Sequence, residues 1–324
     1  MTAAERDTPA APAAETTGPE AVPPAPEAGA PPEEERRVGT PFLVLQFFLF
    51  PMAIVAVCVG VFLIFGFIAH EGKGARDYLN EIRRGGASVL DLNRRWQAAY
   101  ELSQALEAGN DPALKDPRFV DEVLAVFQGA KEDDPRVRRY LAVALGRLRD
   151  KRAVPALLEA ALGQGQGAAE DEDTQFYAVV SLGTIGDPSA LPDLIALGRS
   201  SDPGLRKAVA HALGALPSDE SRAALLTLAQ DQVEDVRWNA ALALARRGDA
   251  AAAPVLLAMM DRAHMQEVPG LDDAAREEAT MEAVRVAPVV PDPALHAALL
   301  KLRESDPSLK VREAAARALD QKPR

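Results

Sequence analysis

Few side chains in this sequence are of the kinds that carry catalysis or hold metal ions. The chain of 324 residues has a single cysteine, Cys58, and four histidines. One cysteine excludes an intramolecular disulfide framework and a zinc site built on cysteines. Neither a Walker-type lysine loop nor a serine nucleophile elbow is present. We therefore predict no catalytic residue, no metal site and no cofactor, and expect the functional residues on binding surfaces.

The charge of the chain points away from nucleic acids. Its formal net charge is −12 at pH 7. A protein that binds a phosphate backbone needs a basic surface, because its Lys and Arg side chains neutralise the phosphates. We therefore expect protein partners and no nucleic-acid partner.

Two motifs recur along the C-terminal part of the chain with one shared set of irregular spacings. The first ends in an aliphatic anchor residue, and the second is a pair of aliphatic residues that follows it. The anchors are residues 102, 145, 182, 213, 244, 286 and 319, and the pairs begin at residues 157, 194, 225, 256 and 299. Shared irregular spacing predicts a repeated unit of two elements.

Both elements of this unit have a helical pattern. Val137, Leu141, Leu145 and Leu148 form an apolar stripe of helical period. An Asp-Pro dipeptide favours a helix start, because Asp caps the first turn and proline needs no hydrogen-bond acceptor there. Seven such dipeptides occur, with the aspartates at 111, 116, 134, 187, 202, 292 and 306. No segment alternates with the period of a strand, so we predict an all-α fold.

The unit DPRVRRYLAVALGRLRDKRAVPALLEAAL, residues 134–162, resembles the short HEAT-like repeat of the phycobilisome lyase type. The resemblance extends over about residues 92–321 and implies a right-handed α-solenoid of six or seven helix pairs. It also implies an extended surface for other proteins. Elementary packing agrees, because a helix pair with one apolar face needs neighbours on both sides.

Enzymes among the HEAT-like proteins provide the alternative function. The resemblance implies paired His-Glu dyads for the hydroxylases, whereas this chain has one such dipeptide, His70-Glu71. Lyases of the family have no short signature to test and stay as an unlikely alternative. We therefore expect a protein that is not an enzyme.

Two neighbouring positions, or slots, of the first helix recur from repeat to repeat, and the residues in them suggest different roles. One holds arginines that we expect to form an internal ladder with turn acids such as Asp150, Asp187 and Asp249; they are Arg95, Arg138, Arg206, Arg237 and Arg312. The next slot lies about 200° around the helix from the Val137 slot and should face outward. It carries three aromatics that we predict as protein-interaction residues, with packing against a neighbouring helix as the alternative: Trp96, Phe176 and Trp238. Insertions at residues 163–173 and 263–276 could carry recognition or be tolerated surface loops.

The N-terminal part divides into a tail and an apolar run. Residues 1–40 hold 8 of the 25 prolines and few aliphatic residues, so we expect them to be disordered. Residues 41–69 run for 29 positions without a charge. Because about 20 apolar residues cross a bilayer, this run predicts one transmembrane helix. Residues 70–91 would then connect it to a solenoid over residues 92–324.

The flanks of the apolar run give conflicting signals about its orientation in a lipid bilayer. Two basic residues precede the run, Arg36 and Arg37, whereas four follow it: Lys73, Arg76, Arg83 and Arg84. Positive-inside counting places the solenoid in the cytoplasm, but long domains translocate largely regardless of charge. We favour the cytoplasmic side and leave the other open.

Small residues within the run suggest a further contact. Ala53, Ala56 and Gly60 share one helix face and would let another helix approach closely. Chance in a span rich in Ala, Val and Gly is the alternative.

These features predict a single-pass membrane protein that acts as a non-catalytic scaffold or adaptor. Its partners would be other proteins, a membrane complex among them. The main alternative is an accessory subunit or assembly factor of a larger membrane complex.

Overall fold

The computed structural model describes residues 49–69, 73–84, 89–130, 134–163 and 171–321, with the backbone alone over residues 62–69. The described residues contain helices and no β-strand. Contacts divide the chain into two units, Met1–Glu71 and Gly72–Arg324. The predicted disordered tail, residues 1–40, lies outside the described residues.

The first unit is described by helix α2 (Phe50–Ala69). The side chains of this helix are described as far as Val61. Among the described residues, no helix is long and apolar enough to cross a membrane. This finding corrects the predicted transmembrane helix over residues 41–69 and the integral, single-pass localisation.

The second unit consists of fifteen α-helices and five short 3₁₀ helices within its described residues. The α-helices are α3 (Ala75–Arg84), α4 (Val89–Glu107), α5 (Arg118–Gly129), α6 (Pro135–Leu148), α7 (Val154–Ala161), α8 (Glu172–Ile185), α9 (Leu191–Leu197), α10 (Pro203–Gly214), α11 (Asp219–Leu228), α12 (Glu234–Ala245), α13 (Ala253–Met260), α14 (Arg262–Glu267), α15 (Asp273–Val286), α16 (Pro293–Ser305) and α17 (Leu309–Asp320). The 3₁₀ helices are η2 (Pro112–Lys115), η3 (Lys151–Ala153), η4 (Pro188–Ala190), η5 (Ala250–Ala252) and η6 (Ala287–Val289).

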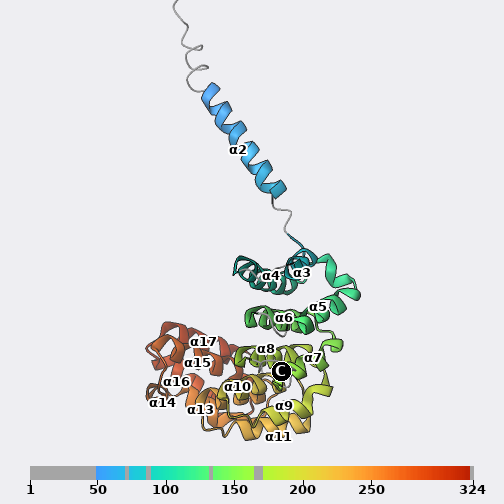
Figure 1. Ribbon diagram of the computed structural model, residues 1–324. Coiled ribbons are helices and arrows are strands. Elements are labelled where there is room, and N and C mark those ends of the chain that lie inside the picture. Colours follow the sequence, from blue (N-terminus) through green and yellow to red (C-terminus); the bar gives the residue numbers. More distant parts are fainter. Residues whose placement is uncertain (1–48, 70–72, 85–88, 131–133, 164–170, 322–324) are drawn as a thin grey trace, which may run out of the picture. The chain divides into compact units, whose positions relative to one another are not determined.

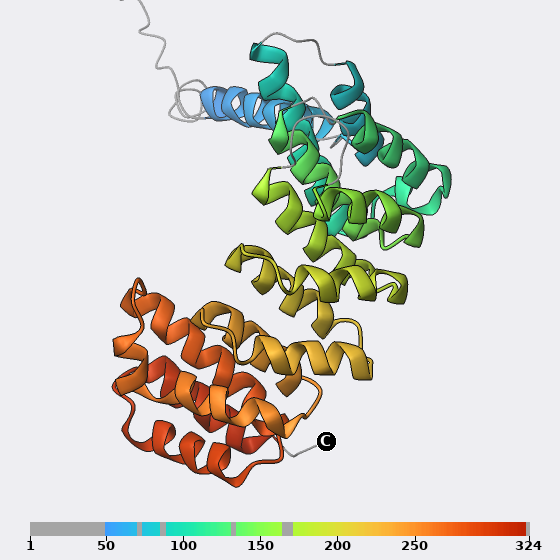
Figure 2. The same cartoon turned by 60° about the horizontal axis from the view of Figure 1, so that its bottom comes forward.

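These helices stack in two layers (Figures 1 and 2). The first layer is α4, α6, α8, α10, α12, α15 and α17, and each of its helices contacts the next. Each helix of the second layer packs against the first-layer helix that follows it: α3 on α4, α5 on α6, α7 on α8, α9 on α10, α11 on α12, α13 on α15 and α16 on α17. The predicted all-helical solenoid is confirmed for the described residues, whereas the predicted transmembrane helix is wrong.

Aspartate caps begin several of the helices, as the Asp-Pro dipeptides predict. Asp134, for example, accepts a hydrogen bond at 2.9 Å from the main-chain nitrogen of Arg136. Five of the seven predicted aspartates are N-caps: Asp111, Asp134, Asp187, Asp202 and Asp292. The last one, Asp306, instead precedes the actual cap of α17, which is Ser308.

Glycines follow the anchor leucines where first-layer helices approach one another. A Cβ atom built on Gly146 of α6 would lie 2.7 Å from the Cβ of Ser181 in α8. One built on Gly183 of α8 would lie 2.6 Å from the Cα of Ala212 in α10. These distances are shorter than van der Waals contact, so the missing side chains set the spacing of the first layer.

The predicted arginine ladder is internal, but its partners are mostly main-chain carbonyls. Three of its arginines donate to the carbonyl oxygen six residues earlier: Arg206 to Ser200, Arg237 to Asp231 and Arg312 to Asp306. Arg206 also forms two hydrogen bonds with the carboxylate of Asp231, at 2.7 and 2.9 Å. The turn acids expected as partners bind other groups; Asp249, for example, pairs with Arg222.

We expect replacement of Asp231 by Asn to give a stability loss that depends on pH. The hydrogen bond from Arg206 is the largest cause that lowers the pKa of Asp231. A carboxyl with a lowered pKa stabilises the folded state above its unfolded pKa of about 3.9, and loses this contribution as pH falls through the folded pKa. Asp231→Asn should therefore lower the free energy of unfolding by about 1.5–3 kcal/mol at pH 7.

Urea unfolding at pH 7 and pH 3 measures this effect, with Asp320→Asn at an exposed position as the control. The difference in free energy of unfolding between Asp231→Asn and the wild type should become smaller below about pH 4. A free-energy difference of the same size at both pH values would mean that the charge of the Asp231 carboxylate does not contribute to stability.

Candidate interaction site

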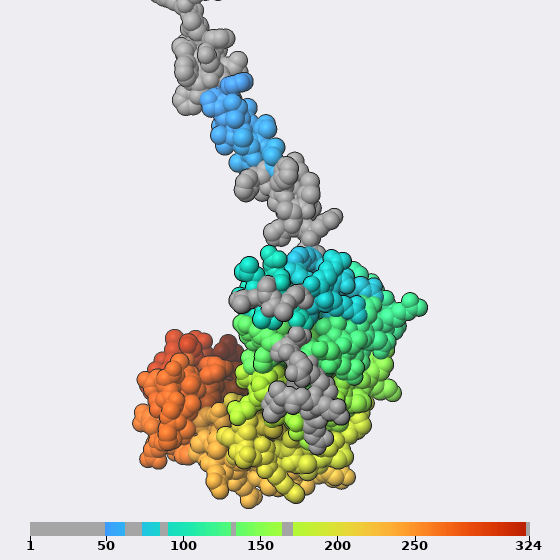
Figure 3. All heavy atoms as spheres, in the orientation of Figure 1, coloured from blue at the N-terminus to red at the C-terminus, as the bar shows by residue number. Residues whose placement is uncertain are grey.

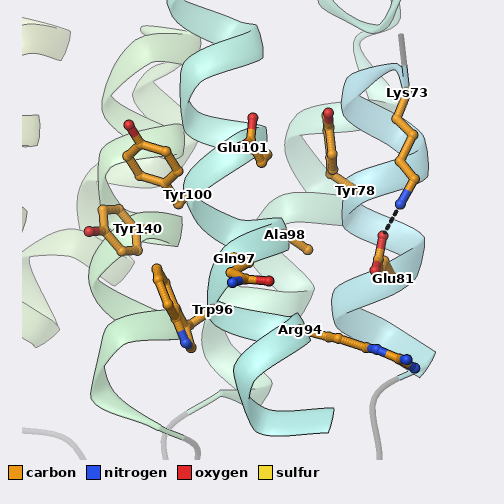
Figure 4. Close-up of a pocket in the computed structure, with 10 residues that line it drawn as sticks. All are labelled: Lys73, Tyr78, Glu81, Arg94, Trp96, Gln97, Ala98, Tyr100, Glu101 and Tyr140. Atoms are coloured by element: carbon orange, nitrogen blue, oxygen red, sulfur yellow. Dashed lines mark hydrogen bonds and ion pairs between the residues drawn. The ribbon is translucent and has the colours of Figure 1, made fainter. Parts of the chain in front are cut away.

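A cavity of about 680 Å³ lies at the N-terminal end of the second unit, between α3, α4 and α6 (Figure 4). We call it the aromatic groove. Its lining residues are Lys73, Tyr78, Glu81, Arg94, Trp96, Gln97, Ala98, Tyr100, Glu101 and Tyr140. Its volume falls within the range of small-molecule and peptide pockets, about 300–1,000 Å³.

The floor of the groove is formed by three side chains on one face of α4. Arg94, Gln97 and Glu101 are separated by three and four residues, so they share one face of the helix. Figure 4 shows these three side chains along α4, with Gln97 between the two charged residues. The floor therefore has a positive end, a neutral middle and a negative end.

One wall of the groove is aromatic. Trp96 and Tyr100 lie one turn apart on α4, and Tyr140 comes from α6 (Figure 4). The rings of Tyr100 and Tyr140 meet edge to face, with centroids 5.3 Å apart and planes at 75°. Tyr100 keeps 38% of its surface exposed. The wall thus offers ring surface in two orientations to a bound molecule.

A cation covers one ring of this wall. The guanidinium carbon of Arg136 lies 4.9 Å from the centroid of Trp96. Arg136 also pairs with Asp134, at 2.6 Å between Nη2 and Oδ2. The indole nitrogen of Trp96 donates to the side-chain oxygen of Asn93 at 3.3 Å. Trp96 is therefore held in place from two sides while remaining half-buried.

The opposite wall comes from α3. This helix buries Ala75, Leu79 and Ile82 against α4, which leaves Tyr78 and Glu81 on the side that faces the groove (Figure 4). Lys73 pairs with Glu81 at 2.7 Å and lies 5.9 Å from the ring centroid of Tyr78. The hydrogen bond to Glu81 raises the pKa of Lys73. This wall is electrically balanced, because its one cation and its one anion neutralise each other.

The structure separates the three aromatics that the sequence placed in one outward slot. Trp96 lines the groove, and Phe176 is half-buried in α8, where it meets Tyr177 edge to face at 5.3 Å. Trp238 has only 5% of its surface exposed. The expectation that this slot faces outward is therefore wrong for Trp238.

The insertion at residues 263–276 approaches α12, the helix that carries Trp238. Nε2 of His264 in α14 lies 3.8 Å from Oε1 of Glu234, and Glu234 lies one turn before Trp238 on the same face of α12. Met265 and Val268 of the insertion are buried. The segment considered as a recognition loop is thus itself partly buried in the solenoid.

The predicted packing face of the apolar run lies on α2. Ala53 and Ala56 are exposed, and a Cβ atom built on Gly60 would meet nothing within 4 Å. A helix partner for Ala53, Ala56 and Gly60 therefore stays a prediction.

Sequence reasoning missed most of the groove, although one signal was present. Tyr78, Tyr100 and Tyr140 are three of the four tyrosines of the chain. Tyr100 follows Trp96 by four residues, which places both rings on one helix face. A search for paired aromatics at this spacing would have found the wall, but not Tyr78 on α3.

Other parts of the described chain offer less for binding. A cavity of about 290 Å³ near α14, α15 and α17 is lined by charged residues that pair internally, such as Arg262 with Asp306 and Arg276 with Asp273. No group of three or more His, Cys, Asp or Glu side chains suited to a metal ion occurs among the described residues. His70 and Glu71 lie outside them.

Comparisons with known proteins agree with the fold. A model of HEAT repeats matches residues 120–199, 161–232 and 195–271. No curated protein matches the sequence significantly.

Three of the solved structures that match this chain are matched over most of their own length. Human deoxyhypusine hydroxylase, in complex with glycerol, is 20% identical, with 76% of this chain and 88% of that chain covered and a TM-score of 0.33. YibA of Escherichia coli is 14% identical, with 76% and 92% covered and a TM-score of 0.45. An engineered protein is 19% identical, with 75% and 95% covered and a TM-score of 0.36. Because their TM-scores are below 0.5, these three structures carry no argument about this chain. Residues 120–271 match HEAT repeats, and the second unit is an all-helical solenoid.

Proposed function

We propose that this protein is a non-catalytic interaction scaffold that binds a segment of a partner protein in the aromatic groove. The observation that carries the proposal is the grouping of Trp96, Tyr100 and Tyr140 along one wall of a cavity in a helical solenoid. Tyr and Trp are enriched among residues that dominate binding energy at protein interfaces. The solenoid supports this role, because stacked repeats present extended surfaces to partners.

The charge of the protein supports a protein partner over a nucleic acid. Of the charged residues that line the groove, Lys73 and Arg94 are balanced by Glu81 and Glu101. The whole chain is acidic, at −12. A neutral, aromatic groove in an acidic protein suits a peptide segment better than a phosphate backbone.

We expect Tyr100→Ala to weaken partner binding at least tenfold while leaving the fold intact. Loss of an aromatic anchor at an interface costs about 2 kcal/mol or more, whereas an exposed substitution changes stability by about 0.5 kcal/mol. Tyr177→Ala is the matched control, because Tyr177 is half-buried on α8 and lies outside the groove. Affinity purification of the full chain, followed by quantitative mass spectrometry, compares the partners captured by the wild type, Tyr100→Ala and Tyr177→Ala.

Partners lost with Tyr100→Ala and kept with Tyr177→Ala would support the proposal. Partners kept by both variants would contradict it, and so would partners lost equally from both. Circular dichroism of each variant checks that the fold is unchanged.

A further inference from the structure

The aromatic groove is not built like a groove that takes an amphipathic helix. Its apolar surface consists of four aromatic rings and Ala98, and no Leu, Ile, Val or Met lines it. A helical ligand presents aliphatic anchors and satisfies its own carbonyl groups. A polyproline II segment has no internal hydrogen bonds and docks on aromatic-lined grooves. The lining therefore favours an extended, proline-rich ligand.

Hydrogen-bond donors are available for the carbonyl groups of such a ligand. The groove contains the side-chain amide of Gln97 and the hydroxyl groups of Tyr78, Tyr100 and Tyr140. Within the described part of the chain, none of these four side-chain groups is hydrogen-bonded. Because a polyproline II backbone leaves every carbonyl free, it can use these donors, whereas a helix cannot.

The two unpaired charges on the floor of the groove determine how far apart the charged side chains of a ligand should be. Arg94 and Glu101 make no ion pair with any described residue. They lie seven residues apart on α4, which corresponds to about 10 Å along the helix axis. A polyproline II helix rises about 3.1 Å per residue, so three to four of its residues span this distance.

We propose that the aromatic groove binds an extended proline-rich segment of a partner protein, with an acidic and a basic side chain three to four residues apart. The acidic side chain pairs with Arg94 and the basic one with Glu101, while proline rings pack on Trp96, Tyr100 and Tyr140. This inference rests on the proposed function and names the class of ligand for the same site.

The test uses the full chain and the fluorescence of Trp96. The chain has two tryptophans, so Trp238→Phe leaves Trp96 as the single reporter inside the groove. Three synthetic peptides are titrated at low ionic strength. The first contains Glu-Pro-Pro-Pro-Lys, and the second contains Lys-Pro-Pro-Pro-Lys. The third is an alanine-rich helical peptide with Glu and Lys seven positions apart, which matches the charge distance on a helical backbone.

We expect the Glu-Pro-Pro-Pro-Lys peptide to change the Trp96 emission in a saturable way and to bind tighter than the other two. In the Arg94→Glu variant its affinity should fall about two- to fivefold, as for an exposed ion pair, and the peptide with two lysines should become the better ligand. In Tyr100→Ala all proline-rich binding should fall about tenfold. Arg94 is exposed, so its substitution should leave the fold intact.

Tighter binding of the helical peptide would overturn the inference and assign the groove to a helix. Proline-rich binding that is indifferent to both Arg94→Glu and Tyr100→Ala would also overturn it, as would no response of Trp96 to any peptide. If no peptide binds while partner capture still depends on Tyr100, this inference fails and the proposed function stands. If the peptide binds but partner capture is independent of Tyr100, the proposed function fails instead.

Discussion

Replacement of Trp238 by alanine is expected to lower the free energy of unfolding by about 3–5 kcal/mol. Trp238 is 95% buried, since only 5% of its surface is exposed. The side chain belongs to the buried core of the solenoid, together with Met265 and Val268 of the insertion. Removal of the indole would leave a cavity that rigid neighbouring helices cannot fill.

Urea unfolding followed by circular dichroism measures this loss, and Trp238→Phe is the matched control. The indole nitrogen of Trp238 has no hydrogen-bond partner among the described residues. Substitution by phenylalanine therefore removes side-chain volume without removing a hydrogen bond. The loss in Trp238→Phe should therefore be less than half that in Trp238→Ala. An unchanged melting temperature in Trp238→Ala would show that the residue is not packed as the structure has it.

The location of the damage can be tested as well. In a solenoid each repeat contacts only its neighbours, so a local loss of packing opens the adjacent helices first. Hydrogen exchange in Trp238→Ala should accelerate in α12, α13 and α14 before it changes in α4 or α6. Uniform acceleration along the chain would contradict this nearest-neighbour behaviour.

Local chemistry explains which parts of the fold could be predicted from the sequence. Helix starts at Asp-Pro dipeptides depend on a few adjacent residues, and five of the seven aspartates serve as caps. The all-helical solenoid follows from the apolar period of each helix and from the repeat spacing, which are also properties of short segments.

Contacts between distant segments explain what could not be predicted. Trp96, Phe176 and Trp238 hold equivalent slots, yet Trp96 and Phe176 are half-buried and Trp238 is buried, so one slot has different exposures in different repeats. The ladder partner of Arg206 is Asp231, 25 residues away in the loop after α11, and no local pattern specifies this pairing. The groove likewise needs α3, within the stretch 70–91 that the sequence suggested as a connector.

The apolar run shows the limit of composition as a guide. Its 29 uncharged residues exceed the length that a bilayer requires. Among the described residues, however, no helix is long and apolar enough to cross a membrane. An uncharged run of sufficient length therefore does not by itself establish a spanning helix.

Replacement of Gly183 by alanine is expected to lower the free energy of unfolding by about 1–2 kcal/mol, although alanine is the better helix former. Intrinsic propensity favours alanine by about 1 kcal/mol within a helix. The added Cβ would lie 2.6 Å from the Cα of Ala212 and 2.8 Å from its Cβ. Because the nearest atom belongs to the backbone of α10, a side-chain rotation cannot relieve the clash. Overpacking costs about 1–3 kcal/mol, and a clash with backbone belongs to the upper part of this range, about 2–3 kcal/mol, which leaves a net loss of about 1–2 kcal/mol after the gain in propensity.

Gly129→Ala separates the clash from the propensity effect. Gly129 ends α5, and a Cβ atom there would meet nothing within 4 Å. This variant should leave stability unchanged or raise it by up to about 1 kcal/mol. Chemical unfolding of both variants beside the wild type gives the two differences. A Gly183→Ala protein as stable as Gly129→Ala would mean that α8 and α10 can move apart freely, and that the glycine after the anchor leucine does not set the spacing of the solenoid.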